Sequence, residues 1–314
     1  MNKLSASALR RPAVICLLAG MSCLLWGSAF PAVKVGYALL GISSADTAAQ
    51  LIFAGLRFLC AGVVTILFQS ITQKRFVRPA KNAGSCVVKL GLMQTFAQYA
   101  MFYIGMANTS GVKGSVLNSV NVFFAIIISA KIFHYETLSA KKLLGCLCGF
   151  GGVVLINLAD STMGGGFNLV GDGAVLMAAV ASGLAVSMLK RYAEREDAMV
   201  LCGYQFLVGG GALLLLGLCF GGKLPMFTLP SLLLLLYMVL VSAVAQTIWS
   251  ILNKYNPVGK VAVYGFLTPV TGVILSALVL QEGKQAFTWY SLAALVLVCI
   301  GIFLVNRGDG PKKA

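Results

Sequence analysis

The feature that most constrains this chain is a series of apolar runs that recurs along its whole length. The hydrocarbon core of a bilayer is roughly 30 Å thick, so an α-helix crosses it with about 20 mostly apolar residues. Only helices or closed barrels can cross, because every backbone N–H and C=O group must be satisfied within the protein. Barrel strands alternate between apolar and polar residues, whereas these runs are uniformly apolar. The sequence therefore predicts an all-α integral membrane protein.

The composition agrees with a membrane protein. Hydrophobic residues make up 59% of the chain and charged residues only 11%, whereas a soluble domain carries roughly 25% charged residues. The formal net charge of +15 would make nucleic acid a candidate partner for a soluble protein. Here the basic residues lie in short segments between the apolar runs, so we expect the lipid bilayer as a partner and no nucleic acid.

Ten of the apolar runs are long enough to be transmembrane helices. They cover residues 12–33, 51–70, 87–107, 112–133, 142–159, 169–190, 198–220, 229–252, 259–280 and 287–306. Ten spans place both termini on the same side of the membrane. The connections are short, so we expect the function to reside within the helix bundle.

The basic residues are distributed unequally between the two sides of this topology. On the side that lacks the termini, the sequence places only Lys34, Arg57, Lys113, Lys223 and Lys284 out of 24 Lys and Arg residues. Basic residues accumulate in cytoplasmic loops. The sequence therefore predicts a multi-pass protein of the plasma membrane with both termini in the cytoplasm, and an uncleaved first span that also targets the chain.

Two segments of the chain resemble each other, residues 112–157 and residues 258–306. In each, a long helix ends at a glutamate, Glu136 and Glu282, at the same spacing from the start of the segment. With five spans in each half, the second half must be inverted relative to the first. Inverted repeats are typical of secondary transporters. The alternative is chance similarity among apolar helices.

Three motifs resemble those of a known family. They are the run Leu25–Phe30 in the first span, Gly55–Phe58 in the second, and Tyr264–Val270 leading to Glu282 in the ninth. Together they are similar to the motifs of EamA-type proteins of the drug/metabolite transporter superfamily. The resemblance implies two EamA-like five-helix repeats, residues 12–159 and 169–306. It also implies a metabolite or amino-acid-like substrate, which such proteins often export.

Two prolines are the predicted hinges. Pro31 removes a backbone donor and is expected to break or kink the first helix. Pro269 lies in the family-like motif of the ninth span. The residue that corresponds to Pro269 in the first half is Phe123, so we do not expect a symmetric proline hinge in the fourth helix.

Polar and aromatic side chains at membrane depth are the candidates for substrate binding, because such polar groups are costly there and usually face a cavity or a partner helix. We predict a site formed by Trp26, Ser28, Gln98, Tyr99, Asn118, Gln246, Trp249, Tyr264 and Thr268. Amide groups beside aromatic walls suit a small polar or amphipathic solute. The alternative is that each amide bonds a neighbouring helix and holds the bundle together.

The charged residues of the spans are few. Lys34 and Arg57 are predicted to lie towards the non-cytoplasmic side, where Lys34 either reaches the surface or binds an anionic group. Asp172 falls near a span end. No Asp or Glu falls in the middle of a predicted span, which argues against proton coupling.

The two matched glutamates also fall near span ends. We expect Glu136 and Glu282 to cap loops or to pair with Lys141 and Lys284.

Motifs for catalysis, metals and cofactors are absent from the sequence. Most of the nine cysteines lie inside apolar runs, and His134 is the single histidine, so we expect no metal and no cofactor. Neither a phosphate-binding loop nor a hydrolase motif occurs. We therefore predict a protein that is not an enzyme.

The sequence leaves two functions open. The first is a secondary transporter that moves a small organic solute, by efflux, through alternating access. The second is a membrane receptor or assembly factor that binds a small ligand without transporting it. A homodimer is left open in both cases.

Overall fold

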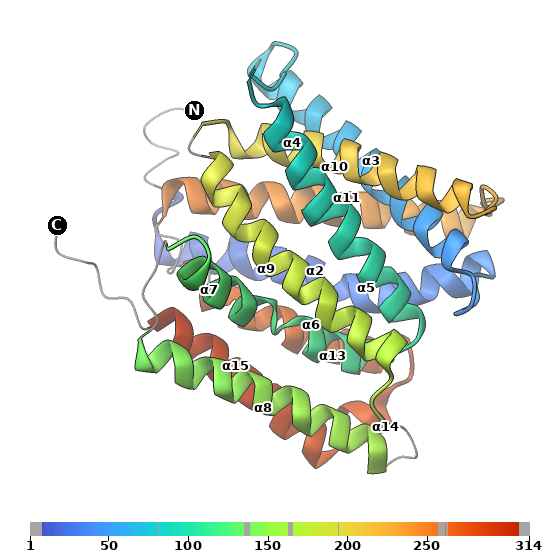
Figure 1. Cartoon of the computed structure of the whole chain (residues 1–314), viewed down its shortest axis with the longest axis vertical. Coiled ribbons are helices and arrows are strands. Elements are labelled where there is room, and N and C mark those ends of the chain that lie inside the picture. Colours follow the sequence, from blue (N-terminus) through green and yellow to red (C-terminus); the bar gives the residue numbers. More distant parts are fainter. Residues whose placement is uncertain are drawn as a thin grey trace.

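The computed structural model describes residues 8–80, 82–134, 139–162, 166–193, 195–256, 261 and 263–307. Within these residues the chain is helical and contains no strand (Figure 1). Ten helical stretches occupy the positions of the ten predicted spans. They are α2 (Pro12–Leu40), α3 (Thr47–Gln73), α4–η1–α5 (Gly84–Leu90, Gly91–Ala97, Gln98–Ala107), α6–α7 (Gly111–Asn118, Asn121–Lys131), α8 (Ala140–Thr162), η2–α9 (Leu169–Gly173, Ala174–Ala193), α10 (Ala198–Cys219), α11 (Leu229–Tyr255), η3–α13 (Val263–Phe266, Leu267–Val279) and α15 (Trp289–Arg307), with a short α14 (Gly283–Ala286) before the last.

Six helices in the described part of the chain are long and apolar enough to cross a membrane. They are Pro12–Leu40, Thr47–Gln73, Gly111–Lys131, Leu169–Ala193, Met199–Cys219 and Leu229–Trp249, and the apolar helices Leu267–Val279 and Trp289–Leu304 are shorter. Large apolar side chains such as Leu17, Phe68 and Leu147 are exposed on the outside of the bundle. The prediction of an all-helical membrane protein is confirmed, because a water-soluble bundle would not leave so many of them exposed.

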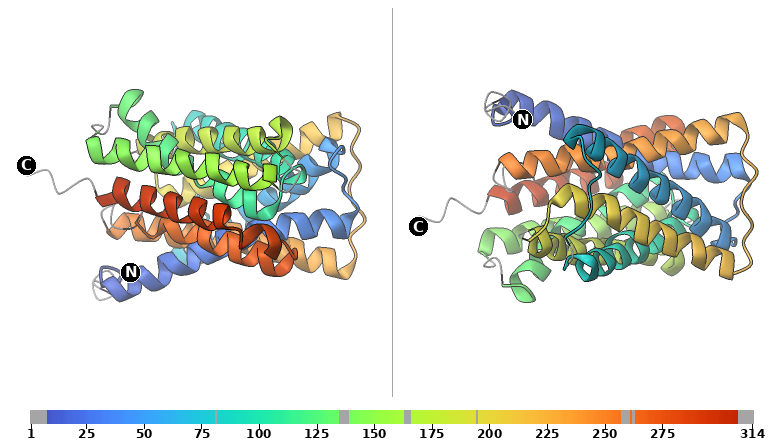
Figure 2. Two further views of the ribbon diagram at one scale, coloured as in Figure 1. Left: turned by 90° about the horizontal axis from the view of Figure 1, so that it is seen from below. Right: turned by 90° about the horizontal axis from the view of Figure 1, so that it is seen from above.

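The start of α2 and the end of α15 lie at the same end of the bundle, which we call the terminal end (Figure 2). The connection between α10 and α11 lies at the opposite end, which we call the distal end. Successive stretches alternate in direction. The short connections after α2, α5, α8 and α13 therefore also lie at the distal end.

Glycines allow the closest helix pairs to form. A Cβ atom on Gly55 of α3 would lie 2.5 Å from the backbone nitrogen of Leu214 in α10, and one on Gly210 would lie 2.5 Å from that of Leu59. In the α8–α15 pair, a Cβ atom on Gly301 would lie 2.6 Å from the carbonyl oxygen of Gly145. Small residues let backbones approach where no hydrophobic effect drives association inside a membrane.

The contacts between helical stretches recur when each stretch is replaced by the one five places away in the chain. The first stretch, α2, packs against the eighth and ninth, α11 and α13. The sixth, α9, packs against the third and fourth, which contain α5 and α7. The second packs on the seventh, the fourth on the ninth and the fifth on the tenth. Exchanging the first five stretches with the last five leaves this pattern of neighbours unchanged.

The first helix is longer than predicted. It continues past the expected end at residue 33 to Leu40, and Pro31 is buried inside it without ending it. Of the two effects predicted for Pro31, the break is wrong and the kink stays a prediction. Proline is tolerated in membrane helices because the groups that it frees find partners among neighbouring helices.

The fourth and ninth stretches are irregular at matching places. The fourth is interrupted at residues 119–120 between α6 and α7, and the ninth begins with the 3₁₀ turn η3 before α13. These irregularities precede Phe123 and Pro269, the two positions that the sequence comparison aligned. Proline is therefore not needed for the interruption of the fourth stretch.

Arg57 is deeper than predicted. It lies ten residues after Thr47, the first residue of α3, which corresponds to about 15 Å along the helix. Its side chain is 3% exposed. Arg57 is still nearer the distal end of α3 than the other end, since Gln73 lies 16 residues further along the helix. Its predicted placement towards the non-cytoplasmic side stays a prediction.

Candidate functional site

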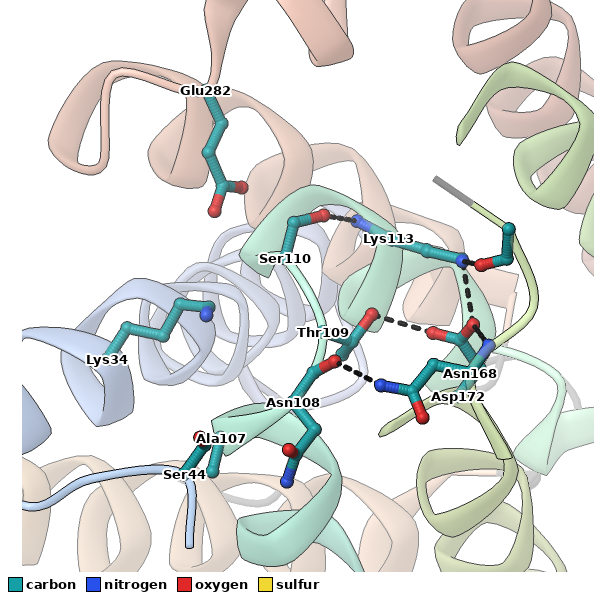
Figure 3. Close-up of a pocket in the computed structure, with 11 residues that line it drawn as sticks. Lys34, Ser44, Ala107, Asn108, Thr109, Ser110, Lys113, Asn168, Asp172 and Glu282 are labelled. Atoms are coloured by element: carbon teal, nitrogen blue, oxygen red, sulfur yellow. Dashed lines mark hydrogen bonds and ion pairs between the residues drawn. The ribbon is translucent and has the colours of Figure 1, made fainter. Parts of the chain in front are cut away.

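A polar cleft opens at the distal end of the bundle, with a volume of about 540 Å³. Four of the residues that line it are charged (Figure 3). The lining residues are Lys34, Ser44, Ala107, Asn108, Thr109, Ser110, Lys113, Gly166, Asn168, Asp172 and Glu282. A cavity of this size is typical for a small-molecule site.

A buried ion pair forms one wall of the cleft. The Nζ atom of Lys113 lies 2.7 Å from Oδ2 of Asp172, and the side chains are 3% and 1% exposed. The hydroxyl of Thr109 donates to Oδ1 of Asp172 at 2.7 Å, and the backbone N–H of Asn168 donates to Oδ2 at 2.8 Å. Lys113 also donates to the carbonyl of Gly166 at 2.9 Å. The pair thus ties the start of α6 to the start of the sixth stretch.

Local helix chemistry positions both members of this pair. Ser110 is the N-cap of α6 and accepts a hydrogen bond from the backbone N–H of Lys113. Asn168 is the N-cap of η2 and accepts from the backbone N–H of Val170. Asp172 therefore lies in the first turn of its helix, where the helix dipole favours a negative charge.

Glu282 joins the other side of the cleft to the same helix. Its Oε1 and Oε2 atoms accept hydrogen bonds from the backbone N–H groups of Gly111 and Val112, at 3.0 and 2.9 Å. The carboxylate of Glu282 thus caps the start of α6 from a residue that follows α13. Glu282 therefore acts as a cap, as predicted, and the helix that it caps is distant in the sequence. No ion pair between Glu282 and Lys284 is seen in the described part of the chain. Glu136 lies outside the described residues.

Lys34 is the fourth charged residue of the cleft. It extends from α2 and is half-buried, with its ammonium group on the same side of the opening as Glu282 (Figure 3). Of the two roles predicted for Lys34, the binding of an anionic group suits this position, because the side chain lines a cavity.

None of the nine predicted substrate-binding residues lines this cleft. Three of them come together deeper in the bundle, between α2, α11 and η3. The rings of Trp26 and Trp249 lie 5.1 Å apart. Trp249 and Tyr264 pack on the same apolar cluster around Ile15 and Leu252.

Thr268 lies close to this group in the chain, one helical turn after Tyr264. Its carbonyl oxygen accepts a hydrogen bond from the hydroxyl of Thr271, which also donates to the carbonyl of Cys23 in α2. Pro269 is buried in the first turn of α13, where proline is tolerated. The predicted hinge roles of Pro31 and Pro269 stay predictions.

A second group of predicted residues lies around α5. The ring centroid of Tyr99 is 4.0 Å from that of Phe58, and Tyr99 also makes an edge contact with Phe102. The preceding residue, Gln98, has its Oε1 atom buried without a hydrogen-bond partner in the described part of the protein. Gln98 follows the π-helical segment η1, a type of irregularity that often occurs at functional sites.

The remaining predicted residues lie apart from both groups. The hydroxyls of Ser28 and Tyr237 share a hydrogen bond. Gln246 donates from Nε2 to the sulfur of Cys202 at 3.6 Å, a helix–helix contact of the kind proposed as the alternative. Asn118 is half-buried at the end of α6. The structure therefore divides the predicted site into separate groups.

The sequence analysis missed most of the cleft. Asn108, Thr109 and Asn168 are ordinary loop and cap residues in the sequence. Asp172 and Lys113 were noted only as charges near span ends. Their pairing depends on which helix ends lie together, and a single sequence does not contain that information. A cap residue followed by an acidic residue four positions later, as in Asn168 and Asp172, was the available signal.

Replacing Glu282 with alanine is expected to loosen the start of α6. The change removes the acceptors of two helix N-terminal amides and should cost about 1–2 kcal/mol, as the loss of a helix cap does. Hydrogen exchange at Gly111 and Val112 should become faster. The matched control is Lys284→Ala at an exposed neighbouring site, with an expected change within about 0.5 kcal/mol. Unchanged exchange in Glu282→Ala would contradict the capping role.

Comparison with known proteins places these features in context. The model of the EamA-like transporter family matches the chain twice, at residues 13–158 and 169–307. An uncharacterised transporter of Bacillus subtilis, YvbV, is 26% identical over 95% of this chain and 93% of its own length. A protein of Escherichia coli named as a probable amino-acid metabolite efflux pump is 27% identical over 95% and 96% of the two chains.

A solved crystal structure has a similar fold. It matches with a TM-score of 0.63 and 18% identity, over 93% of this chain and 96% of the other. At this level of identity the likeness concerns the fold alone.

Proposed function

Because the chain belongs to the EamA-like transporter family, we propose that it is a secondary transporter that moves a small organic solute across the plasma membrane by alternating access. The family and the named relatives support a multi-pass membrane transporter of small metabolites.

The observation that carries the proposal is the pattern of helix neighbours, which is unchanged when the two halves of the chain are exchanged. The family model also matches each half once. Because each half crosses the membrane an odd number of times, the two repeats have opposite orientations. The bundle can then adopt two equivalent conformations, one open to each side of the membrane. Ten crossings and the repeats at residues 12–159 and 169–306 are part of this proposal.

The sides of the membrane are assigned from charge. Nearly all basic residues fall at the terminal end, and basic loops are cytoplasmic. The distal cleft then faces the outside, which makes this conformation outward-open. At the terminal end, Ile15, Ala19, Leu252 and Val261 form a buried apolar cluster that closes the cytoplasmic side.

For the substrate we propose an amino-acid-like or other small organic solute that is exported. The E. coli relative is named for the efflux of amino-acid metabolites. Trp26, Trp249 and Tyr264 supply aromatic surface at depth, and Gln98 supplies an amide acceptor without a partner among the described residues. Such a combination suits a solute with both polar and apolar parts.

Transport by the purified protein in liposomes tests the proposal. We would measure the flux of radiolabelled amino acids, nucleosides, amines and organic acids without ATP. Trp249→Ala should lower the flux of the transported solute by about tenfold or more, equivalent to the loss of roughly 1.4 kcal/mol in the rate-limiting state. Trp289→Ala is the matched control, because Trp289 is 86% exposed on the outside of the bundle.

The outcomes separate the two functions that the sequence leaves open. Flux of a solute, reduced in Trp249→Ala and preserved in Trp289→Ala, supports the transporter. A ligand that raises the melting temperature by mass action but produces no flux supports the receptor. A complete panel with neither flux nor thermal stabilisation contradicts the proposed substrate class.

A further inference from the structure

Arg57 is a buried cation for which the protein supplies no anion in its described part. The Nε–H group donates to the carbonyl of Met238 at 3.2 Å and to the hydroxyl of Ser242 at 3.0 Å. Nη1 donates to the hydroxyl of Tyr103 at 3.0 Å. All three acceptors are neutral. A buried charge without a counterion is strongly destabilising, and an arginine in a membrane interior is costlier still.

The acidic residues that the structure describes are engaged elsewhere. Asp46 and Asp197 accept hydrogen bonds from N-terminal amides of α3 and α10. Glu196 accepts from the backbone of Ala80, and Asp172 and Glu282 lie in the distal cleft. The side chains of the other four, Glu136, Asp160, Glu194 and Asp309, lie outside the described residues.

The guanidinium group keeps hydrogen-bonding capacity for a ligand. Arginine has five N–H donors in a planar fork that matches a carboxylate in a bidentate fashion. The contacts of Arg57 use Nε and Nη1, so Nη2 has no acceptor among the described residues. The hydroxyl of Tyr103 accepts from Arg57, and its own proton is available to a second acceptor.

Aromatic rings surround the buried arginine. The guanidinium carbon lies 5.0 Å from the ring centroid of Phe58. Phe58 in turn contacts Tyr99 at 4.0 Å and Phe206 at 5.5 Å. A ligand whose anionic group binds Arg57 would place its apolar part against these rings.

The arginine lies close to the distal cleft and is screened from it. Tyr103 is one helical turn below Ala107, which lines the cleft. The rings of Tyr37, Phe53 and Tyr103 contact one another edge to face at 5.9–6.2 Å, and Tyr37 donates to the carbonyl of Tyr103. This layer must move before a solute from the cleft can reach Arg57.

We propose that Arg57, with the hydroxyl of Tyr103, binds the carboxylate of the transported solute within the membrane. This inference rests on the proposed transport function and names its substrate class, a monoanionic carboxylate with an apolar or aromatic remainder. A single guanidinium balances one carboxylate charge, whereas a phosphate ester carries about −1.5 to −2 and calls for further cations. Gln98 and Gln205 directly precede Tyr99 and Phe206, the rings that contact Phe58, and their Oε1 atoms, which have no partner in the described part of the chain, offer neutral acceptors for a second polar group.

Binding to the purified protein in detergent tests the inference. The probes are the twenty common amino acids together with their carboxamides, which replace the carboxylate with a neutral group of nearly the same size. The wild-type protein should be stabilised thermally by at least one amino acid with an apolar side chain and not by its carboxamide. This comparison needs no variant and is therefore independent of any folding defect.

Variants then locate the carboxylate. Arg57→Gln should weaken binding of that amino acid by about tenfold or more, the usual loss for a charged hydrogen bond. Arg57→Lys should bind more weakly than wild-type because it lacks the bidentate fork. Tyr103→Phe retains the ring and loses the hydroxyl, so a few-fold weakening is expected. If Arg57→Gln does not fold, two tests remain. They are the comparison of acid and carboxamide on the wild-type protein and the affinity of Tyr103→Phe.

The possible results separate this inference from the transporter proposal. Flux in liposomes with equal affinity for an acid and its carboxamide overturns the Arg57 site and leaves transport standing. Acid-selective binding that depends on Arg57 but occurs without flux supports the site and contradicts transport. Unchanged affinity in Arg57→Gln, or no stabilisation by any acid of the panel, overturns the inference and assigns Arg57 a structural role.

Discussion

Asp172→Asn should be among the most destabilising single substitutions in this protein, with an expected loss of about 3–5 kcal/mol. The change removes the negative charge that lies 2.7 Å from the buried ammonium of Lys113. The hydroxyl of Thr109 and the N–H of Asn168 also lose a charged acceptor. Reversible unfolding in mixed detergent micelles measures the loss.

Three further variants make this test specific: Asp46→Asn, Lys113→Met, and the double variant Lys113→Met, Asp172→Asn. Asp46→Asn is the matched control, because it is the same substitution at an exposed helix cap at the distal end, where Asn caps about as well as Asp and the expected change is within about 0.5 kcal/mol. The double variant Lys113→Met, Asp172→Asn should lose less than the sum of the single variants, since removing both charges is less costly than removing one. Additive losses would show that the two charges do not stabilise each other.

Gly27→Ala is expected to lower both stability and transport. A Cβ atom on Gly27 would overlap the hydroxyl oxygen of Thr271 and would lie 2.9 Å from the backbone nitrogen of Gly272 in α13. That hydroxyl is held by the carbonyls of Cys23 and Leu267, so it cannot simply rotate away. Forcing the helices apart should cost about 1–3 kcal/mol.

The effect of Gly27→Ala on transport should exceed its effect on folding. Trp26 is the neighbouring residue and contacts Trp249 across the bundle, so a shift of α2 moves the proposed binding surface directly. We expect a loss of flux of about tenfold or more, equivalent to 1.4 kcal/mol. The control is Gly20→Ala in the same helix, where a Cβ atom would meet only the side chain of Leu267 at 3.9 Å. Equal flux in the two variants would contradict the account of this interface.

The sequence predicted the helical class, the family and the position of each helical stretch, because span-length apolar runs and family motifs are local signals. The family prediction is confirmed by a model that matches both halves of the chain. The predicted end of the first helix at residue 33 was too early, because the apolar run is interrupted there by Lys34, a residue that does not end a helix. Inside a membrane the helix continues to Leu40, since no water competes for the backbone.

The cleft could be predicted only in fragments. Lys34 was recognised as a candidate for binding an anionic group, and Glu282 as a capping residue. The partners of Glu282, the amides of Gly111 and Val112, lie 170 residues away or more in the chain. Charge counting placed Lys113 and Asp172 near span ends but did not pair them. Arg57 was placed too near the surface, because the apolar run begins four residues after the helix.

The predicted binding residues show the same limit. The proximity of Trp26 and Trp249 depends on the packing of the first helix on the eighth, which a single sequence does not specify. Gln246, by contrast, contacts Cys202 of a neighbouring helix, as a structural amide would. Polarity at membrane depth identifies both kinds of residue and does not distinguish them.

Thiol accessibility at the two ends of the bundle tests alternating access most directly. In a cysteine-free protein, Asn108→Cys reports on the distal cleft and Ala19→Cys on the buried cluster at the terminal end. Both cysteines are labelled with a membrane-impermeant thiol reagent. Alternating access predicts that the transported solute changes the two labelling rates in opposite directions, so that one end becomes protected as the other becomes reactive. A solute that binds and leaves both rates unchanged, or raises both together, would contradict alternating access.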